Sequence, residues 1–465
     1  MPKQCIMFSS TKNSPHAKDY ENMLPQLSFA KIGKSKIHAS FDTPEMTSDF
    51  GTQLLREVDS RTKIISTLAN CIQDWRHPSY VTHSLEDLLR QRVFQICQGY
   101  EDADDCDHLR NDASFKTALG ISPSTDRQLC SQPTMTRLEN GVTLRDLIRL
   151  FYGQIDIFLE SYSSAPKFIV IDVDPSSSHC HGSQQMSMFN KYEDEYCLMP
   201  FHVYEGNTGR EIATVIRPGK TPTAGEIIAL LKRIVKKVKA RFPKTMLVFR
   251  ADGHHSKPKV HEWCKDHGVE YVIGQPGNPV LDRLFQVTID DAKKRFKKTQ
   301  RAVRLYASSF YKAGSWKEHR KVICRILVDA QGRVDTRYIV TTFEQTQAKY
   351  LYDTIYCGRA NAELFIKDHK RALMSDRTSC HRASANQFRL AVHSAAYSLM
   401  HALRENLLKG TSLATATFDT IRVRLLKVAA HVSVMKTKIH FHLPEYFPLK
   451  EVYYLIMERL MVIQT

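Results

Sequence analysis

The spacing of apolar side chains divides the chain into a helical first part and a mixed second part. Between about residues 46 and 160, apolar residues recur three and four positions apart, as in GTQLLREVDSRTKIISTLANCIQDW. This is the period of an amphipathic helix. At PKFIVIDVDP, residues 166–175, the pattern changes to a short β-rich run that ends in proline, which is typical of a buried strand. The pattern therefore predicts a helical N-terminal domain followed by a domain with a sheet.

Strands and helices alternate after this first strand. Two more strands are expected in YCLMPFHVYEG and REIATVIRPG, and an amphipathic helix in TAGEIIALLKRIVKKVKARF. A strand at TMLVFRAD, a helix at KPKVHEWCKDHG and a strand at VEYVIG complete the order β-β-β-α-β-α-β. This order predicts an α/β domain whose mixed sheet is flanked by helices.

The alternation lapses between about residues 276 and 343. There HRKVICRILVDAQGRVDTRYIVTTF predicts a hairpin with its turn at AQGR, so this segment is expected to be a β-rich insertion. Helix is expected again from about residue 345. The expected units are a flexible basic arm (1–45), a helical DNA-binding region (46–160), the two parts of the sheet domain (161–275 and 344–405), the insertion (276–343) and a C-terminal region with a possible role in dimerisation (406–465).

The charge balance narrows the class of partner. The chain has 66 lysines and arginines against 49 aspartates and glutamates, a formal net charge of +17. A polyanion such as DNA matches this excess better than a small acidic substrate does, although basicity that only serves solubility is the alternative.

Cysteines and apolar runs bear on the compartment. None of the eleven cysteines forms a C-x-x-C pair, so a zinc ribbon or a thioredoxin-like site is not indicated. No apolar run is long enough to cross a bilayer, and the N-terminus lacks an apolar signal core. We therefore expect a reduced, soluble protein in the cytoplasm.

Three aspartates lie at the ends of predicted strands. Asp172 and Asp174 end the first strand on one face, because residues two apart in a strand point the same way, and Asp252 ends the fourth strand. Convergent carboxylates repel one another unless cations neutralise them, and Mg²⁺ prefers such oxygen ligands. Each aspartate taken alone has the alternative of an ordinary strand-end residue.

A fourth candidate lies in YCGRANAELFIKDHK, residues 356–370. Taken as a regular helix at ~100° per residue, this stretch brings Tyr356, Arg359, Glu363 and Lys370 within about 60° of one another. The alternative is a solvated face with an Arg359–Glu363 pair. Gly358 lowers helix propensity by up to ~1 kcal/mol, so propensity does not explain the segment.

These four residues fit Y-x2-R-x3-E-x6-K, and the chain here resembles a large group of bacterial insertion-sequence transposases of the DDE class. Their motif follows strand-borne aspartates, and the gap between Asp252 and Glu363 holds the insertion, an arrangement similar to the RNase H-like core with an inserted β domain found in that group. The group usually has D-x-T at the first aspartate and a small residue and a serine after the second. Here Asp174 is followed by Pro175 and Ser176, and Asp252 is followed by GHH.

The resemblance implies that Asp174, Asp252 and Glu363 are catalytic and hold two Mg²⁺ ions, for which Mn²⁺ can substitute. Asp172 competes for the first position, but only Asp174 has a hydroxyl residue two places on. Tyr356, Arg359 and Lys370 are then expected to contact DNA phosphates. Trp316, among basic residues of the insertion, is expected either to stack on an extruded base or to be a buried hairpin anchor.

The implied function is transposition. The protein is expected to bind the terminal inverted repeats of its own element, to cleave and join DNA by a cut-and-paste route, to act as a homodimer on paired ends, and to associate with the bacterial nucleoid. The alternative is an inactive or domesticated DNA-binding protein.

Overall fold

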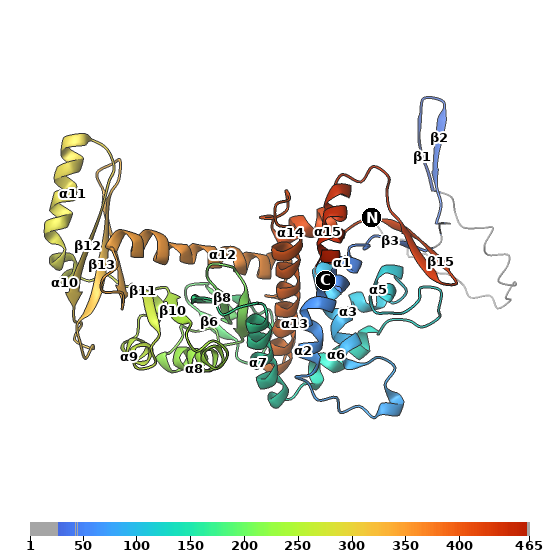
Figure 1. Ribbon diagram of the computed structural model, residues 1–465, viewed down its shortest axis with the longest axis horizontal. Helices are drawn as coiled ribbons and strands as arrows, with labels where there is room; N and C mark the ends of the chain where they lie inside the picture. Colours follow the sequence, from blue (N-terminus) through green and yellow to red (C-terminus); the bar gives the residue numbers. More distant parts are fainter. Residues whose placement is uncertain (1–26, 42, 44, 463–465) are drawn as a thin grey trace, which may run out of the picture.

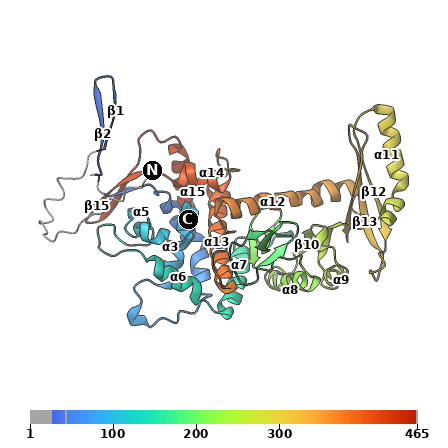
Figure 2. The same cartoon turned by 180° about the vertical axis from the view of Figure 1, so that it is seen from behind.

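The computed structural model describes residues 27–41, 43 and 45–462 (Figures 1 and 2). The molecule is elongated. The helices of its N-terminal third lie at one end, a mixed sheet lies in the middle, and α11 lies with its neighbouring strands at the other end (Figure 1). A long helical segment that contains α12 extends from the insertion to α13 in both views.

The N-terminal third is helical, as predicted. Capping side chains define its helix ends; for example, Ser84 accepts from Asp87 N at the start of α3, and Gly99 ends that helix with φ 91°. The helices are α1 (Thr52–Thr62), α2 (Ile64–Ala69), η1 (Pro78–Tyr80), α3 (Leu85–Gln98), α4 (Asp105–His108), α5 (Ala113–Ala118), α6 (Gln132–Gly141) and α7 (Leu144–Glu160).

These helices pack around α13 (Ala383–Ala402), which is buried on nearly all sides. A helix that is apolar all round belongs in a core, and α13 supplies Phe388, Ala395 and Tyr397 to a cluster that also holds Leu55 and Phe94. One hydrophobic core therefore crosses the sequence boundary between the helical region and the second part of the sheet domain.

The main sheet has the order β12-β13-β14-β11-β10-β4-β8-β9. Strands β4, β10 and β11 are parallel to one another. β8 pairs antiparallel with β4, and β9 pairs antiparallel with β8, so the predicted mixed sheet is confirmed. The strands of its first part are β4 (Phe168–Pro175), β8 (Phe201–Glu205), β9 (Glu211–Val215), β10 (Met246–Ala251) and β11 (Glu270–Gln275). Helices α8 (Ala224–Arg241) and α9 (Pro258–Asp266) connect them, and a small sheet of β5 (Ser178–His179), β6 (Met188–Asn190) and β7 (Glu195–Leu198) follows β4.

The insertion continues the same sheet. Its meander of β12 (Val303–Tyr311), β13 (Arg320–Val328) and β14 (Val334–Thr341) joins the core because β14 pairs antiparallel with β11. The predicted turn at AQGR is present, with Gly332 at φ 80°. The insertion also contains α10 (Pro279–Leu284) and α11 (Gln286–Thr299), which the sequence analysis did not separate from the β-rich segment.

The segment that carries the motif is not a regular α-helix. Two π-helical stretches, η3 (Tyr350–Tyr356) and η5 (Asp368–Ala372), flank a 3₁₀ turn, η4 (Cys357–Arg359), and the α-helix α12 (Ala360–Lys367). A π turn closes with one residue more than an α turn, and a 3₁₀ turn with one fewer. The constant angular step used to align the four motif residues therefore does not hold along this segment.

A strand early in the described chain pairs with a strand from its last part. β15 (Ala430–Met435) pairs with β16 (Lys438–His442) and with β3 (Met46–Thr47). The remaining elements are η6 (Leu403–Leu407), α14 (Phe418–Ile421), η7 (Arg422–Leu426) and α15 (Lys450–Val462). Residues 1–26 of the expected arm lie outside the described residues, whereas 27–39 form the exposed hairpin β1 (Leu27–Ile32) and β2 (Ser35–Ala39).

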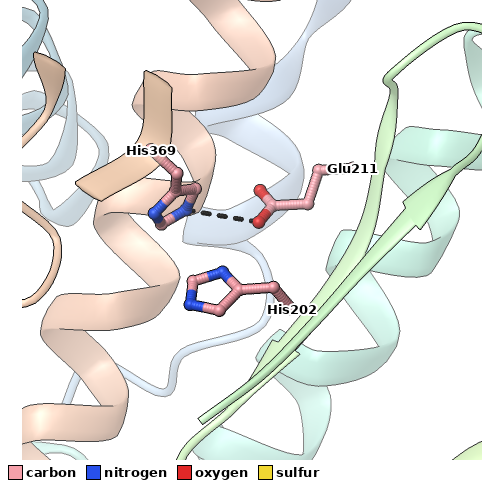
Figure 3. A group of neighbouring side chains, drawn as sticks. All are labelled: His202, Glu211 and His369. Carbon is pink, nitrogen blue, oxygen red and sulfur yellow. Dashed lines mark ion pairs between the residues drawn. The ribbon is translucent and has the colours of Figure 1, made fainter. Parts of the chain in front are cut away.

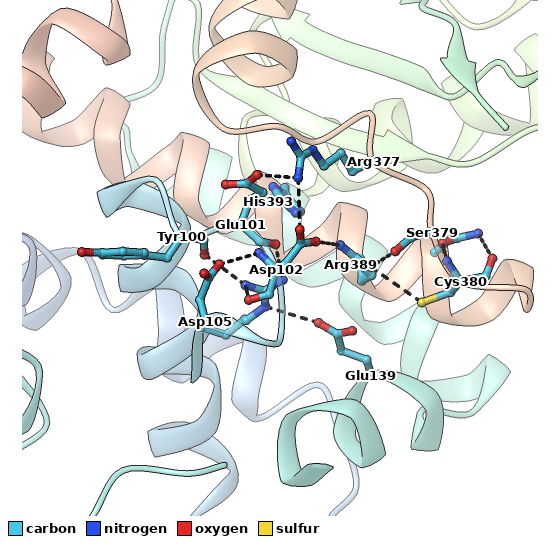
Figure 4. Close-up of polar contacts among 12 residues, drawn as sticks. Tyr100, Glu101, Asp102, Asp105, Glu139, Arg377, Ser379, Cys380, Arg389 and His393 are labelled. Atoms are coloured by element: carbon cyan, nitrogen blue, oxygen red, sulfur yellow. Dashed lines mark hydrogen bonds and ion pairs between the residues drawn. The ribbon is translucent and has the colours of Figure 1, made fainter. Parts of the chain in front are cut away.

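The acidic loop that contains Glu101 and Asp102 connects the helical region, through ion pairs, to α13 and the segment before it (Figure 4). Arg377 pairs with Glu101 at 2.6 Å and with Asp102 at 3.0 Å, and Arg389 reaches Asp102 at 3.4 Å. Arg92, buried beneath the loop, donates to the carbonyl of Glu101 and pairs with Glu139. These contacts fix the helical region to the second part of the sheet domain.

Trp316, in the insertion, is buried. Its side chain is 5% exposed and lies edge-on to His261 and Tyr311, with the guanidinium of Arg320 5.7 Å from the ring centre. Of the two roles expected for Trp316, this burial fits the hairpin anchor better than stacking on a base. Among the described residues, no helix is long and apolar enough to cross a membrane.

We expect Trp316→Ala to lower the free energy of unfolding by about 3–5 kcal/mol, the usual cost of truncating a buried tryptophan. Trp75, which is 69% exposed, supplies the matched control, and Trp75→Ala should change stability by no more than about 0.5 kcal/mol. Urea titrations followed by circular dichroism measure both. Equal stability of the two variants would contradict the buried position.

Candidate active site

A buried ion pair lies beneath the site. Asp172 on β4 and Arg250 on β10 are directly opposite in the parallel register, and both carboxylate oxygens accept from the guanidinium at 2.6 Å. Arg250 also donates to the carbonyl oxygen of Ile355 at 2.6 Å. Burial raises the pKa of Asp172 to about 6, although Arg250 acts to lower it. Asp172, the competing candidate for the first metal-binding position, thus has Arg250 as its partner in this structure.

The same register brings Asp174 and Asp252 together. Each lies two residues beyond a member of the ion pair, and side chains two apart in a strand share a face. Because parallel strands end at the same edge, the two carboxylates meet there. Burial raises the pKa of Asp174, and the nearby charge of Asp252 adds to this while Arg359 opposes it. The two aspartates therefore interact electrostatically, as expected for a shared site.

Asp252 is held by the two histidines that follow it. Its side chain accepts from His254 N at 3.0 Å, and its oxygens lie 3.0 Å from His254 Nδ1 and 2.7 Å from His255 Nδ1. Burial acts to raise the pKa of Asp252, but the hydrogen bonds from these histidines and the charges of His255 and Arg359 hold it below its usual range. Asp252 is therefore ionised at neutral pH. The GHH segment, which departs from the resembled motif, orients the carboxylate.

Arg359 joins the motif segment to the first aspartate. Its Nη1 lies 3.0 Å from Asp174 Oδ2, and both side chains are partly buried. Burial alone would lower the pKa of Arg359, but the charges of Asp174 and Asp252 raise it above its usual value. In this structure the positive charge beside the two aspartates is Arg359, which we had expected to face phosphate.

The motif segment lies very close to the strand ends. A Cβ added at Gly274 on β11 would lie 2.6 Å from the Tyr356 hydroxyl, and one added at Gly358 would lie 2.6 Å from Arg250 Nη1. Gly358, unexplained by helix propensity, is therefore required by the close approach of this segment to the buried ion pair. Tyr356 is half-buried, and burial raises the pKa of its hydroxyl.

Glu363 and Lys370 lie farther along the same segment. Glu363 is exposed on α12, one turn after Arg359, and forms no hydrogen bond or ion pair with a described residue. Lys370 Nζ donates to the carbonyl oxygen of Ser177, just beyond β4, and lies 3.8 Å from Asp376. The structure thus brings Tyr356, Arg359, Asp174 and Asp252 together. Within the described residues, no hydrogen bond or ion pair joins Glu363 to this group.

Sequence reasoning missed Arg250, the hydrogen bond by which His255 holds Asp252, and a buried cluster of His202, Glu211 and His369. Arg250 gave no signal, because an arginine inside an apolar strand has no motif of its own. The adjacency of His255 to Asp252 was visible, but its complete burial was not.

The free energy of unfolding of two variants distinguishes the roles of Asp172 and Asp174. Asp172→Asn leaves the buried Arg250 charge without its carboxylate, so we expect a loss of about 3–5 kcal/mol in the free energy of unfolding. Asp174→Asn removes a partly exposed charge that Asp252 repels, and its cost should stay below about 1 kcal/mol. Chemical denaturation of both variants measures this difference. Similar losses would contradict the assignment.

Gly358→Ala distinguishes packing from propensity. An isolated helix would gain up to about 1 kcal/mol from this change. Here the new methyl group meets Arg250, which its hydrogen bonds prevent from moving, so we expect a net loss of about 1–3 kcal/mol. Gly141 ends α6 with open space around it, and Gly141→Ala should not destabilise the protein. Thermal unfolding of both variants gives the sign.

Comparison with known proteins identifies the family of the chain. A family model described as transposase DDE domain, group 1, matches residues 29–465. No curated protein matches the chain significantly. Among solved structures, the chain is similar to a piggyBac transposase in a synaptic complex with hairpin DNA, determined by cryo-EM. The identity is 12% and the TM-score 0.40, over 82% of this chain and 80% of that chain. Because the family model covers nearly its full length, this protein belongs to the DDE-domain transposases of group 1.

Proposed function

We propose that the protein is an active transposase of an insertion sequence that cleaves and rejoins DNA with Asp174, Asp252 and Glu363 as its metal-binding carboxylates. The observation that carries this proposal is the meeting of Asp174 and Asp252 at the ends of parallel strands, with Arg359 of the Glu363 motif in contact with Asp174. The commitment of Asp172 to Arg250 leaves Asp174 as the candidate on β4.

The order of the central strands supports an RNase H-like core. Strands β9, β8 and β4 are joined antiparallel, and β10 and β11 lie parallel to β4 on its other side. In open sheets of this kind, ligands bind beyond the carboxyl ends of the parallel strands. Asp174 and Asp252 lie at that edge.

The donor set fits hard divalent cations such as Mg²⁺ or Mn²⁺. Three carboxylates from β4, the end of β10 and α12 supply oxygen ligands, and the exposed Glu363 has no competing partner among the described residues. When bound, two such ions activate the attacking oxygen and stabilise the leaving oxygen of a phosphodiester. Histidines 254 and 255 hold the Asp252 carboxylate in place and keep it ionised.

The basic and aromatic motif residues are proposed to bind the DNA backbone. Arg359 and Lys370 now contact Asp174 and the Ser177 carbonyl, two neighbouring points at the end of β4. Guanidinium and ammonium groups bind phosphate oxygens strongly, so DNA that enters this edge can draw both side chains from their present partners. The partly buried Tyr356 hydroxyl is a further donor at the same edge.

The partners in this proposal are the terminal inverted repeats of the element and a target DNA, with a homodimer on the paired ends and a cut-and-paste route. The net charge of +17 supports a polyanionic partner. Exposed lysines and arginines on α8 and α11 provide basic helix faces for it.

The test is nicking of a duplex that carries the repeats bordering the gene. We expect the wild-type protein to nick it with Mg²⁺ or Mn²⁺ but not with EDTA, and Glu363→Gln to reduce nicking at least about 10³-fold, since the change removes a metal ligand. Glu160→Gln alters another exposed helical glutamate far along the chain and should retain wild-type activity.

Binding of the same duplex, measured in EDTA by fluorescence anisotropy, separates catalysis from recognition. Glu363→Gln should bind as tightly as the wild-type protein. Equal nicking by Glu363→Gln and wild type would refute the catalytic assignment. Tight binding without nicking by the wild type would favour a DNA-binding protein without catalysis.

A further inference from the structure

Three buried side chains meet between the sheet and the motif segment, beside the site already described (Figure 3). His202 comes from β8, Glu211 from β9 and His369 from η5. One potential ligand atom from each lies within 4.8 Å of the other two, and all three residues are buried. Two imidazoles and a carboxylate are a donor set typical of zinc sites.

Two of these side chains have polar atoms without a hydrogen-bond partner. The His202 side chain forms no hydrogen bond with any described residue although His202 is 1% exposed, and its Nδ1 is buried. Glu211 Oε2 is likewise buried without a partner in the described part of the chain. Buried polar groups are almost always satisfied, because leaving them bare costs more than a hydrogen bond contributes. A bound cation would satisfy both atoms.

The third side chain is already oriented as a ligand. His369 Nδ1 is hydrogen-bonded to the Ser375 hydroxyl, which leaves Nε2 facing Glu211. In most metal-binding histidines, the ring nitrogen that does not bind the metal forms a hydrogen bond of this kind, which fixes the orientation of the ring. The distance from His369 Nε2 to Glu211 Oε1 is 3.2 Å. Two ligands about 2.1 Å from one tetrahedral ion lie about 3.4 Å apart, so this pair already has the spacing required.

The arrangement of the two histidine rings and the nearby Ser394 hydroxyl also fit a metal site. The rings of His202 and His369 are nearly perpendicular, with centroids 5.0 Å apart, and a nitrogen of each lies within 4.8 Å of the other and of a Glu211 oxygen. Ser394 Oγ lies 3.3 Å from both His369 Nε2 and Glu211 Oε1, where it can hold a water in the fourth position.

We propose that His202, Glu211 and His369 bind one divalent transition-metal ion of the Zn²⁺ type, separate from the Mg²⁺ ions of the proposed reaction. Imidazole nitrogen favours Zn²⁺ over Mg²⁺, which prefers oxygen ligands and keeps its waters. The inference depends only on these residues, and it stands whether or not the protein cleaves DNA.

This ion has a positioning role. It joins two strands of the sheet to the segment that carries Glu363 and Lys370, through the residue directly before Lys370. His202 is the cross-strand partner of Asp174, and directly paired residues of antiparallel strands share a face. The ion therefore fixes the distance between the first proposed catalytic aspartate and the end of the motif.

The experiment uses the full chain with any affinity tag removed, stripped with EDTA and titrated with CoCl₂. We expect one equivalent of Co²⁺ to give the strong visible bands of a four-coordinate site, and ZnSO₄ to abolish them. Co²⁺ bound by carboxylates and water in octahedral geometry absorbs weakly, so the proposed Mg²⁺ site does not give this signal. Asp174→Asn should retain the bands, which separates the two sites.

Variants assign the ligands. Glu211→Gln keeps the size and hydrogen-bonding capacity of the side chain, and His202→Phe keeps its aromatic contact with Tyr204. Each should weaken Co²⁺ binding at least about tenfold, as loss of one metal ligand does. The control is His261→Gln, which alters another buried histidine with an unpartnered nitrogen, here stacked on Tyr271 and outside the cluster. It should bind Co²⁺ like the wild type.

X-ray absorption at the zinc edge of the wild-type protein needs no variant. Nitrogen and oxygen ligands with imidazole scattering support the proposal, whereas sulfur ligands overturn it. Absence of strong Co²⁺ bands in the folded wild-type protein also overturns it. The proposal is also overturned if the folded Glu211→Gln and His202→Phe variants give the same Co²⁺ bands as the wild-type protein.

Discussion

The buried pair of Asp172 and Arg250 is the interaction on which the rest of the site depends. Burying two charges is costly unless their hydrogen-bonding groups are satisfied, and here the guanidinium reaches both carboxylate oxygens and the carbonyl oxygens of Gly206 and Ile355. The pair thereby links β4, β10 and the motif segment at one point. A Cβ at Gly206 would lie 2.5 Å from Asp172 Oδ2, so the backbone has been fitted around these charges.

Much of the sheet could be predicted from the sequence, because short β-branched runs and capped amphipathic helices are local signals. The capping box of Thr223 and Glu226 is an example, since both partners lie within four residues at the start of α8. The continuity of the insertion with the sheet could not be predicted, because the pairing of Ile273 with Val340 joins residues far apart in sequence and leaves no periodic trace.

The candidate site was predictable in its residue types and less so in its geometry. A two-residue offset placed Asp172 and Asp174 on one face, but only the register with β10 shows which of them has an arginine as its partner. The motif residues were found as a spacing, yet the π-helical turns on both sides of α12 change their angular relation. Such turns depend on tertiary packing, which a constant helical step does not include. Burial of Trp316 was equally non-local, because its ring neighbour His261 belongs to α9 and lies far from it in the sequence.

The hydrogen-bonded ladder from β9 through β11 to β12 has a mechanical consequence. A domain attached by two flexible linkers can turn independently, but a meander that extends an existing sheet shares its twist and bends only with it. Anything held by β12, β13 or α11 is therefore kept at a set offset and angle from the edge where Asp174 and Asp252 lie. The insertion is therefore a continuation of the sheet in structural terms and not a separately hinged domain.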